Sequence, residues 1–93
     1  MNKKRANYLY KFTGTIQKKN QRTNPKHSQY FYQLKVKLEG YFCPHKFFAF
    51  KSKTKAHIWN ALEADSYVGK KYLFSCRNYR GSYYLIDWEE QQN

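Results

Sequence analysis

The sequence predicts an all-β domain, a five-stranded barrel with one short helix between the third and fourth strands. Residues 30–38 alternate apolar and polar side chains, which is the pattern of a strand with one buried and one exposed side. Aromatic residues make up 20% of the 93-residue chain, and abundant Tyr, Phe and Thr favour strands. Apolar residues fall convincingly at helical spacing only in residues 56–64.

The first strand begins near Tyr8. Apolar side chains and one glycine alternate there with polar residues, at Tyr10, Phe12, Gly14 and Ile16. A glycine inside a strand marks a bulge or a tight bend, as at the corner of a barrel. Residues 18–29 contain no aromatic or aliphatic side chain apart from Pro25, so we interpret them as a basic loop that leads to the second strand, residues 30–38.

The third strand is predicted at residues 47–50. Pro44 marks an edge or a break before it, because proline cannot donate in a ladder. The helix over residues 56–64 follows, and Ser52 or Thr54 could cap its start.

Trp59 is predicted to be a core residue that closes one end of the barrel, since it lies on the same side of the helix as other apolar residues. Residues 72–77 and 83–88 form the last two strands, and residues 78–82 form the hairpin loop between them. Three strands, one helix and two strands follow one another in the order of the five-stranded OB-fold barrel.

The length of the chain fits one domain. We divide it into a basic N-terminal arm at residues 1–7, the OB-fold domain at residues 8–88 and a polar tail at residues 89–93.

The net charge of +12 is unevenly distributed. Residues 1–55 hold 14 of the 18 basic residues and one acid, whereas residues 56–93 hold four basic and five acidic residues. Such an excess repels itself in a compact molecule, so we expect a polyanionic partner. An AT-rich genome would also enrich lysine, but it explains the choice of Lys over Arg better than the excess over acids.

Several functional classes are disfavoured. Two cysteines, Cys43 and Cys76, do not form the disulfide framework of a small secreted protein. No apolar run approaches the ~18 residues of a membrane span, and no signal segment follows Met1. We therefore expect an intracellular protein, in a bacterial cytoplasm or in an organelle matrix or stroma.

Metal binding and catalysis have little support in the sequence. The candidate ligands show no paired metal-site spacing, and they are His27, Cys43, His45, His57 and Cys76. The six acids form no paired-carboxylate motif, and the chain has no nucleophile elbow and no phosphate-binding glycine loop. We expect no metal, no other cofactor and no enzymatic activity.

The polar side of residues 30–38 carries Phe31, Gln33, Lys35 and Lys37. A solvated face would explain the lysines, but a phenylalanine among them favours a surface that stacks on bases and neutralises phosphates. Whether Phe47 and Tyr83 face the ligand or the core stays open, because each has an aromatic neighbour. The candidate nucleic-acid-binding residues are Lys11, Lys18, Lys19, Arg22, Lys26, Phe31, Lys35, Lys37, Lys46, Phe47, Lys51, Arg77, Tyr79, Arg80 and Tyr83.

Several short motifs resemble the bacterial-type single-stranded DNA-binding proteins. The alternating first strand with its in-strand Gly14 is similar to that family's first strand. Residues 48–50, the helix and residues 68–74 resemble the family's third strand, helix and following strand. Residues 78–83 lie where the family has a basic loop. The resemblance spans residues 8–88 and implies an OB fold that binds single-stranded DNA.

The chain also departs from that family. The family's typical protein continues into a Gly-rich linker and an acidic tip that recruits other proteins, whereas this chain stops at Asn93. We therefore expect no acidic protein-recruiting tail, as in the tail-less relatives of the primosomal protein N type. Residues 43–45, Cys-Pro-His, are foreign to the family pattern, and no role is carried over to them.

We expect a protein that binds single-stranded nucleic acid with low sequence preference, with DNA favoured over RNA. Its partners would be single-stranded DNA or RNA and, as a homo-oligomer, further copies of the chain. The alternative is a structural OB-fold subunit of a large assembly, such as an organellar ribosome or a respiratory complex, since fold alone does not fix function.

Overall fold

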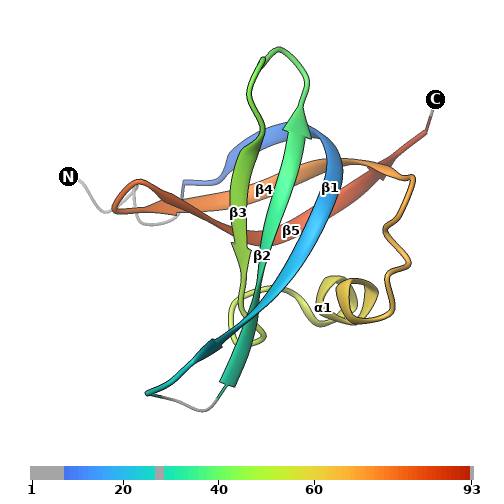
Figure 1. The fold of residues 1–93 in the computed structure, drawn as a ribbon. Coiled ribbons are helices and arrows are strands. Elements are labelled where there is room, and N and C mark those ends of the chain that lie inside the picture. The colour runs from blue at the N-terminus through green and yellow to red at the C-terminus, as the bar shows by residue number, and fades with distance from the viewer. Residues whose placement is uncertain (1–7, 27–28, 93) are drawn as a thin grey trace.

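The structure, a computed structural model, describes residues 8–26 and 29–92 (Figure 1). Its elements are β1 (Tyr10–Asn24), β2 (Gln29–Leu38), β3 (His45–Ala49), α1 (Ala56–Glu63), β4 (Lys71–Tyr79) and β5 (Ser82–Gln91). The strands form a closed barrel in the order β1-β2-β3-β5-β4, in which only the β3–β5 pair is parallel. The predicted fold class, a five-stranded OB-like barrel with its helix between the third and fourth strands, is confirmed.

Strand β1 closes the barrel because it has two neighbours. Its first part pairs with β4, and its longer second part pairs with β2. The two ladders overlap at Gly14 and Thr15, and Gly14 lies opposite Leu38 of β2 and Tyr72 of β4. A Cβ atom at Gly14 would lie 2.1 Å from the carbonyl oxygen of Lys37, so only glycine allows the backbones to approach this closely.

The prediction of a basic loop at residues 18–29 is wrong, because most of this segment belongs to β1. β1 continues through it to Asn24 and pairs residue by residue with β2, from Lys18 opposite Lys35 to Asn24 opposite Gln29. No alternation of apolar side chains marks residues 18–24 as a strand in the sequence. They form a strand because their backbone pairs with β2. His27 lies outside the described residues.

A register shift between Ile16 and Lys18 changes which residues of β1 face inward. Before the shift, Ile16 lies opposite the buried Val36 and faces the barrel interior. After it, Lys19 lies opposite the buried Leu34, and Lys18 faces outward with Lys35. An extra residue in one strand of a pair has this effect, because side chains alternate with a period of two.

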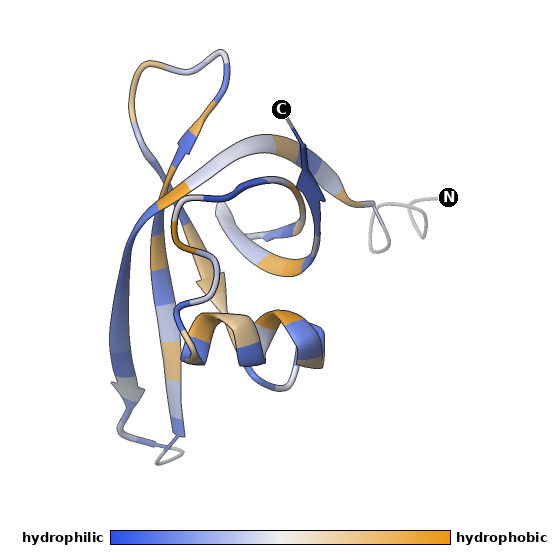
Figure 2. Cartoon of the chain, turned by 90° about the vertical axis from the view of Figure 1, so that its right-hand side faces the viewer, coloured by the Kyte–Doolittle hydropathy of each residue, from blue (hydrophilic) through white to orange (hydrophobic). Residues whose placement is uncertain are grey.

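The core is built from alternate residues of the strands (Figure 2). On β2, Tyr32, Leu34, Val36 and Leu38 are buried, as the alternation of residues 30–38 predicts, whereas Tyr30 on the same side of the strand is exposed. Each other strand contributes fewer buried apolar side chains: Phe47 and Ala49 on β3, Tyr72, Phe74 and Cys76 on β4, and Leu85 on β5. Burial raises the pKa of the Cys76 thiol, which is consistent with the predicted core position.

Helix α1 covers the lower end of the barrel in Figure 1 and buries Ile58, Trp59 and Leu62. The predicted core position of Trp59 is confirmed, since its side chain is 2% exposed and its ring lies 4.9 Å from that of Tyr32. The predicted side-chain cap is wrong. Thr54 is buried, and its hydroxyl donates to the carbonyl of Leu85 on β5 at 2.6 Å, which ties the start of the helix to the barrel.

The last two strands are longer than predicted. A tight turn at Arg80 and Gly81, both with positive φ, joins β4 to β5, as in a type I′ hairpin. β5 runs past the predicted end at Trp88 as far as Gln91. The predicted N-terminal arm, residues 1–7, lies outside the described residues. Phe42, at the tip of the β2–β3 connection, is fully exposed.

We predict that Gly14→Ala destabilises the fold by about 3 kcal/mol, because the new methyl group meets a backbone carbonyl rather than a flexible side chain. Gly40→Ala is the control. It has a positive φ but open space around it, so it should cost only about 1 kcal/mol. Urea unfolding followed by circular dichroism measures both. Equal losses of stability in the two variants would show that the barrel does not require the close backbone approach at Gly14.

We also predict that Trp59→Ala lowers the free energy of unfolding by roughly 3–5 kcal/mol, because a large buried side chain is removed. Ala56→Gly provides a helix control that leaves the core intact, since Ala56 is exposed. It should cost less than about 1 kcal/mol, because Ala56 is the first residue of α1. Thermal melting distinguishes the two variants. A Trp59→Ala protein that melts like the parent would contradict the core position.

Candidate nucleic-acid interface

Three lysines lie side by side across the outer face of the barrel. Lys18 of β1 is opposite Lys35 of β2, and Lys35 is opposite Lys46 of β3. We call Lys18, Lys35 and Lys46 the lysine row. Like charges directly opposite one another destabilise a sheet, so this arrangement costs stability unless negative charge comes to it.

Four aromatic side chains form a cluster farther along the same face: Phe31, Phe48, Phe50 and Tyr84, here called the aromatic cluster. The Phe31 and Phe50 rings are stacked with centroids 4.7 Å apart, and Phe48 lies 6.2 Å from Phe31. Tyr84 of β5 lies 5.7 Å from Phe48 and 5.7 Å from Phe50. All four rings are partly exposed, so they offer apolar faces to a ligand without being loose.

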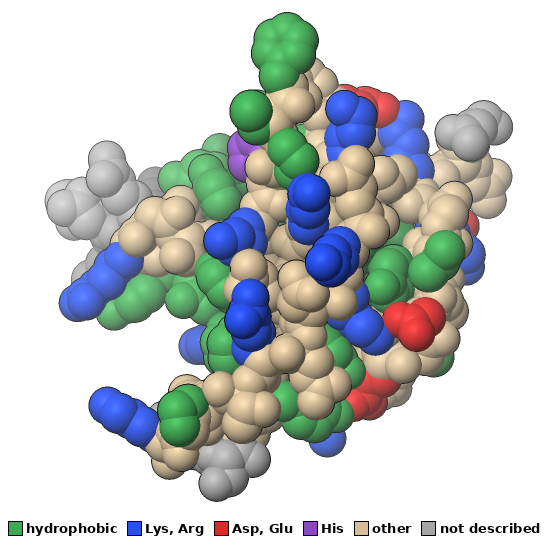
Figure 3. Space-filling model, in the orientation of Figure 1, with side chains coloured by type: hydrophobic (Ala, Val, Ile, Leu, Met, Phe, Trp, Pro, Cys, Tyr) green, Lys and Arg blue, Asp and Glu red, His purple; other side chains and the backbone are tan. Residues whose placement is uncertain are grey.

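Polar groups and cations surround this cluster. Asn20 and Gln33 are paired between the lysine row and the rings, while Arg22 is opposite Phe31 and Arg77 is opposite Tyr84. In residues 8–26 and 29–92, no acidic side chain pairs with the lysine row or with Arg22. Figure 3 shows the basic side chains gathered over β1, β2 and β3, with acidic ones toward the edges.

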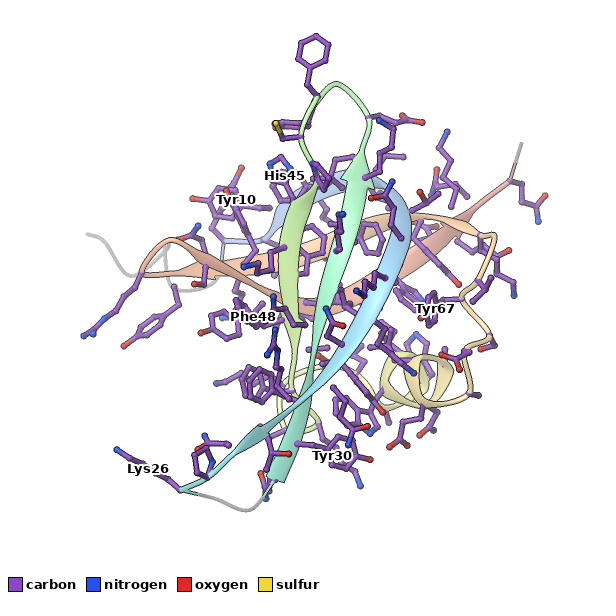
Figure 4. The ribbon with its side chains drawn as sticks, in the orientation of Figure 1. Tyr10, Lys26, Tyr30, His45, Phe48 and Tyr67 are labelled. Atoms are coloured by element: carbon purple, nitrogen blue, oxygen red, sulfur yellow. The ribbon has the colours of Figure 1, made fainter. Side chains whose placement is uncertain are left out.

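Two projecting hairpins border the aromatic cluster. The arm formed by β1 and β2 ends near Lys26, and the β4–β5 hairpin ends at Arg80, whose guanidinium lies 5.3 Å from the ring centroid of Tyr79. Figure 3 shows the molecule hollowed between these hairpins. Phe48 lies between them in Figure 4, and the labelled Lys26 lies at the far end of the arm. The hollow thus has an aromatic floor and basic rims.

Most of the predicted binding residues fall on this face or its borders. The outer face of β1, β2 and β3, together with the turn after β3, holds Lys18, Arg22, Phe31, Lys35, Lys37, Lys46 and Lys51. Arg77 lies next to the aromatic cluster, because it is opposite Tyr84 in the β4–β5 ladder. The tips of the two hairpins hold Lys26, Tyr79 and Arg80. Lys11 is separate, since it lies where β1 pairs with β4, opposite Ser75.

Lys19 does not lie on the outer face. Its ammonium donates to the carbonyl of Leu62 at 2.6 Å and to the carboxylate of Asp65 at 2.8 Å, and it lies 4.8 Å from the ring centroid of Tyr32. Partial burial lowers the pKa of Lys19, but the hydrogen bond and charge of Asp65 outweigh that effect, and the net pKa is raised. The residue fastens the end of α1 to β1.

Phe47 and Tyr83 face inward, so the open question about them is settled toward the core. Phe47 is fully buried, and its ring contacts those of Phe74 and Tyr83. Their neighbours Phe48 and Tyr84 take the outer positions, which the sequence interpretation missed together with Phe50. A signal was present: if Lys46 faces outward, the period of two places Phe48 and Phe50 beside it.

The described part of the chain shows neither a cluster of metal ligands nor a membrane-spanning helix. Within it, no three His, Cys, Asp or Glu side chains gather closely enough to hold a metal ion. No helix in this part is long and apolar enough to cross a membrane. Comparison of the chain with protein-family models, with curated proteins and with solved structures gives no match. The geometry of the face itself therefore carries the functional argument.

The neighbouring lysines 18 and 19 provide a matched test of this face. We predict that Lys19→Ala lowers the free energy of unfolding by about 1–2 kcal/mol, because two charged hydrogen bonds are lost. Lys18→Ala should leave stability unchanged or raise it slightly, because it relieves repulsion with Lys35. Chemical denaturation at neutral pH compares them.

The raised pKa of Lys19 adds a pH signature. Its contribution to stability is complete below the ordinary lysine pKa of 10.5 and is lost as the pH rises through the higher folded value. The difference between Lys19→Ala and the parent should therefore shrink above that pH. Equal stability losses for both lysine variants would contradict their placement on opposite faces.

Proposed function

We propose that this protein binds single-stranded nucleic acid, DNA in the first instance, across the outer face of β1, β2 and β3. The lysine row is the observation that carries the proposal. Three like charges held opposite one another, with no acid paired to them in the described residues, are stabilised by a polyanion.

The aromatic cluster favours a single strand over a duplex. Bases in a duplex are stacked on one another, whereas unpaired bases can stack on protein rings, and any base has a face that can do so. Phe48 and Tyr84 form the floor between two hairpins with basic residues at Lys26 and Arg80. The arrangement therefore supports binding with low sequence preference, with phosphates near the lysine row and bases on the rings.

A structural role in a larger assembly is the second candidate. Phe42 is fully exposed and Tyr41 is about half exposed at the tip of the β2–β3 connection, away from the lysine row. Apolar residues at such a tip suit contact with another macromolecule. A protein of this kind would need its assembly partners to hold nucleic acid, whereas the first proposal requires that the isolated chain bind oligonucleotides.

The test separates the electrostatic and stacking parts of binding. Fluorescence anisotropy with single-stranded oligonucleotides of about ten nucleotides measures affinity over a range of salt. Lys35→Ala should make the salt slope shallower by roughly 0.7, since one phosphate contact is lost. Phe31→Ala should weaken binding by roughly 1–3 kcal/mol with nearly the same slope, because a stacked base releases no counterions.

Lys70→Ala is the control, since Lys70 immediately precedes β4 and forms an ion pair with Glu90 away from the lysine row. It should bind like the parent. Duplexes of equal length should bind more weakly than single strands, and comparing DNA with RNA identifies the preferred strand. Failure of the isolated protein to bind either strand would overturn the proposal and leave the assembly role.

A further inference from the structure

A groove of about 690 Å³ lies at the end of the sheet that faces α1. It lies between the β1–β2 arm and the turn that follows β3, and Figure 4 labels Tyr30 at this end. Its size is within the range of about 300–1,000 Å³ that is typical of small-molecule sites. The groove is half open, and its lining residues come from β1, β2, α1 and the turn after β3.

The walls of the groove are aromatic. On one side, Phe31 and Phe50 present rings that are stacked with an interplanar angle of 14°. On the other side, the ring of Tyr30 is exposed to the groove and packs on the buried Trp59 behind it, with ring centroids 5.7 Å apart. The hydroxyl of Tyr30 donates to the carboxylate of Glu63, which anchors the ring to α1 and raises the pKa of Tyr30 to about 12.

The rim of the groove is basic. Lys51 and Lys53 line it from the turn after β3, and both are exposed, with Ser52 between them. Neither lysine has an ion pair with an acidic residue in the described part of the chain. Flat aromatic walls below two free ammonium groups match a base that is attached to a phosphate.

The groove is continuous with the proposed binding face. Phe31 and Phe50 belong both to the aromatic cluster and to the groove wall. A strand that lies on the cluster therefore reaches the groove without leaving the protein surface. We propose, on the basis of the function proposed above, that the groove receives one base of the bound strand, separated from its neighbours, with the adjoining phosphate at Lys51 and Lys53.

Tryptophan fluorescence reports on this site through the ring contact between Trp59 and Tyr30. The chain has two tryptophans, and Trp88 is stacked on Tyr72 with ring centroids 4.0 Å apart, whereas Trp59 lines the groove. In a Trp88→Phe protein, the emission of Trp59 should change as an oligothymidylate of about ten nucleotides is added. Its midpoint should coincide with the rise in anisotropy of the same strand carrying a terminal dye.

The double variant Lys51→Ala/Lys53→Ala, made in the same background, should weaken binding by about tenfold and reduce the change in Trp59 emission at any given strand concentration. Lys70→Ala in that background is the matched control and should do neither. Thermal melting of each protein confirms that the fold is retained, and exposed lysines are removed without touching the aromatic walls.

The outcomes separate this inference from the broader proposal. A rise in anisotropy with unchanged Trp59 emission, and with no effect of the double variant, would show that the strand binds on the outer face and leaves the groove empty. That result overturns the groove inference alone. No rise in anisotropy for any strand overturns both proposals.

Discussion

The structure depends on the contact between β1 and β2 at Gly14. There β1 has a neighbour on each side, and the backbone of β2 comes so close that a Cβ atom would meet the carbonyl oxygen of Lys37. Without this approach β1 could not pair with β4 and β2 at once, and the sheet would have open edges. Closing the barrel is what satisfies the main-chain groups of those edges and encloses the core.

The same strand also creates the proposed binding face. The register shift after Ile16 turns Lys18 outward, beside Lys35, and sends Lys19 toward α1. Two adjacent lysines thus have different environments. Lys18 lies in the lysine row on the surface, whereas Lys19 donates hydrogen bonds that hold α1 against β1. Repulsion within the lysine row destabilises the fold, but the core and the barrel closure at Gly14 lie away from the row and stabilise it.

Much of this fold follows from periodicity, because burial imposes it. The alternation in residues 30–38 and the helical spacing around Trp59 both predict the observed core. Where burial leaves no pattern, prediction fails: residues 18–24 are a strand by pairing with β2, although no apolar residue marks them. Consecutive rings such as Phe47 and Phe48 carry no alternation of their own, so only the register with β2 assigns their faces.

The parallel junction of β3 and β5 has a consequence for how the barrel moves. It consists of two residue pairs, the shortest ladder of the closed sheet, so little has to break there for the barrel to open locally. Phe48 and Tyr84 lie across it, with ring centroids 5.7 Å apart. A base stacked on both rings would bridge the junction and slow amide hydrogen exchange along it, so that occupancy and local opening become thermodynamically linked.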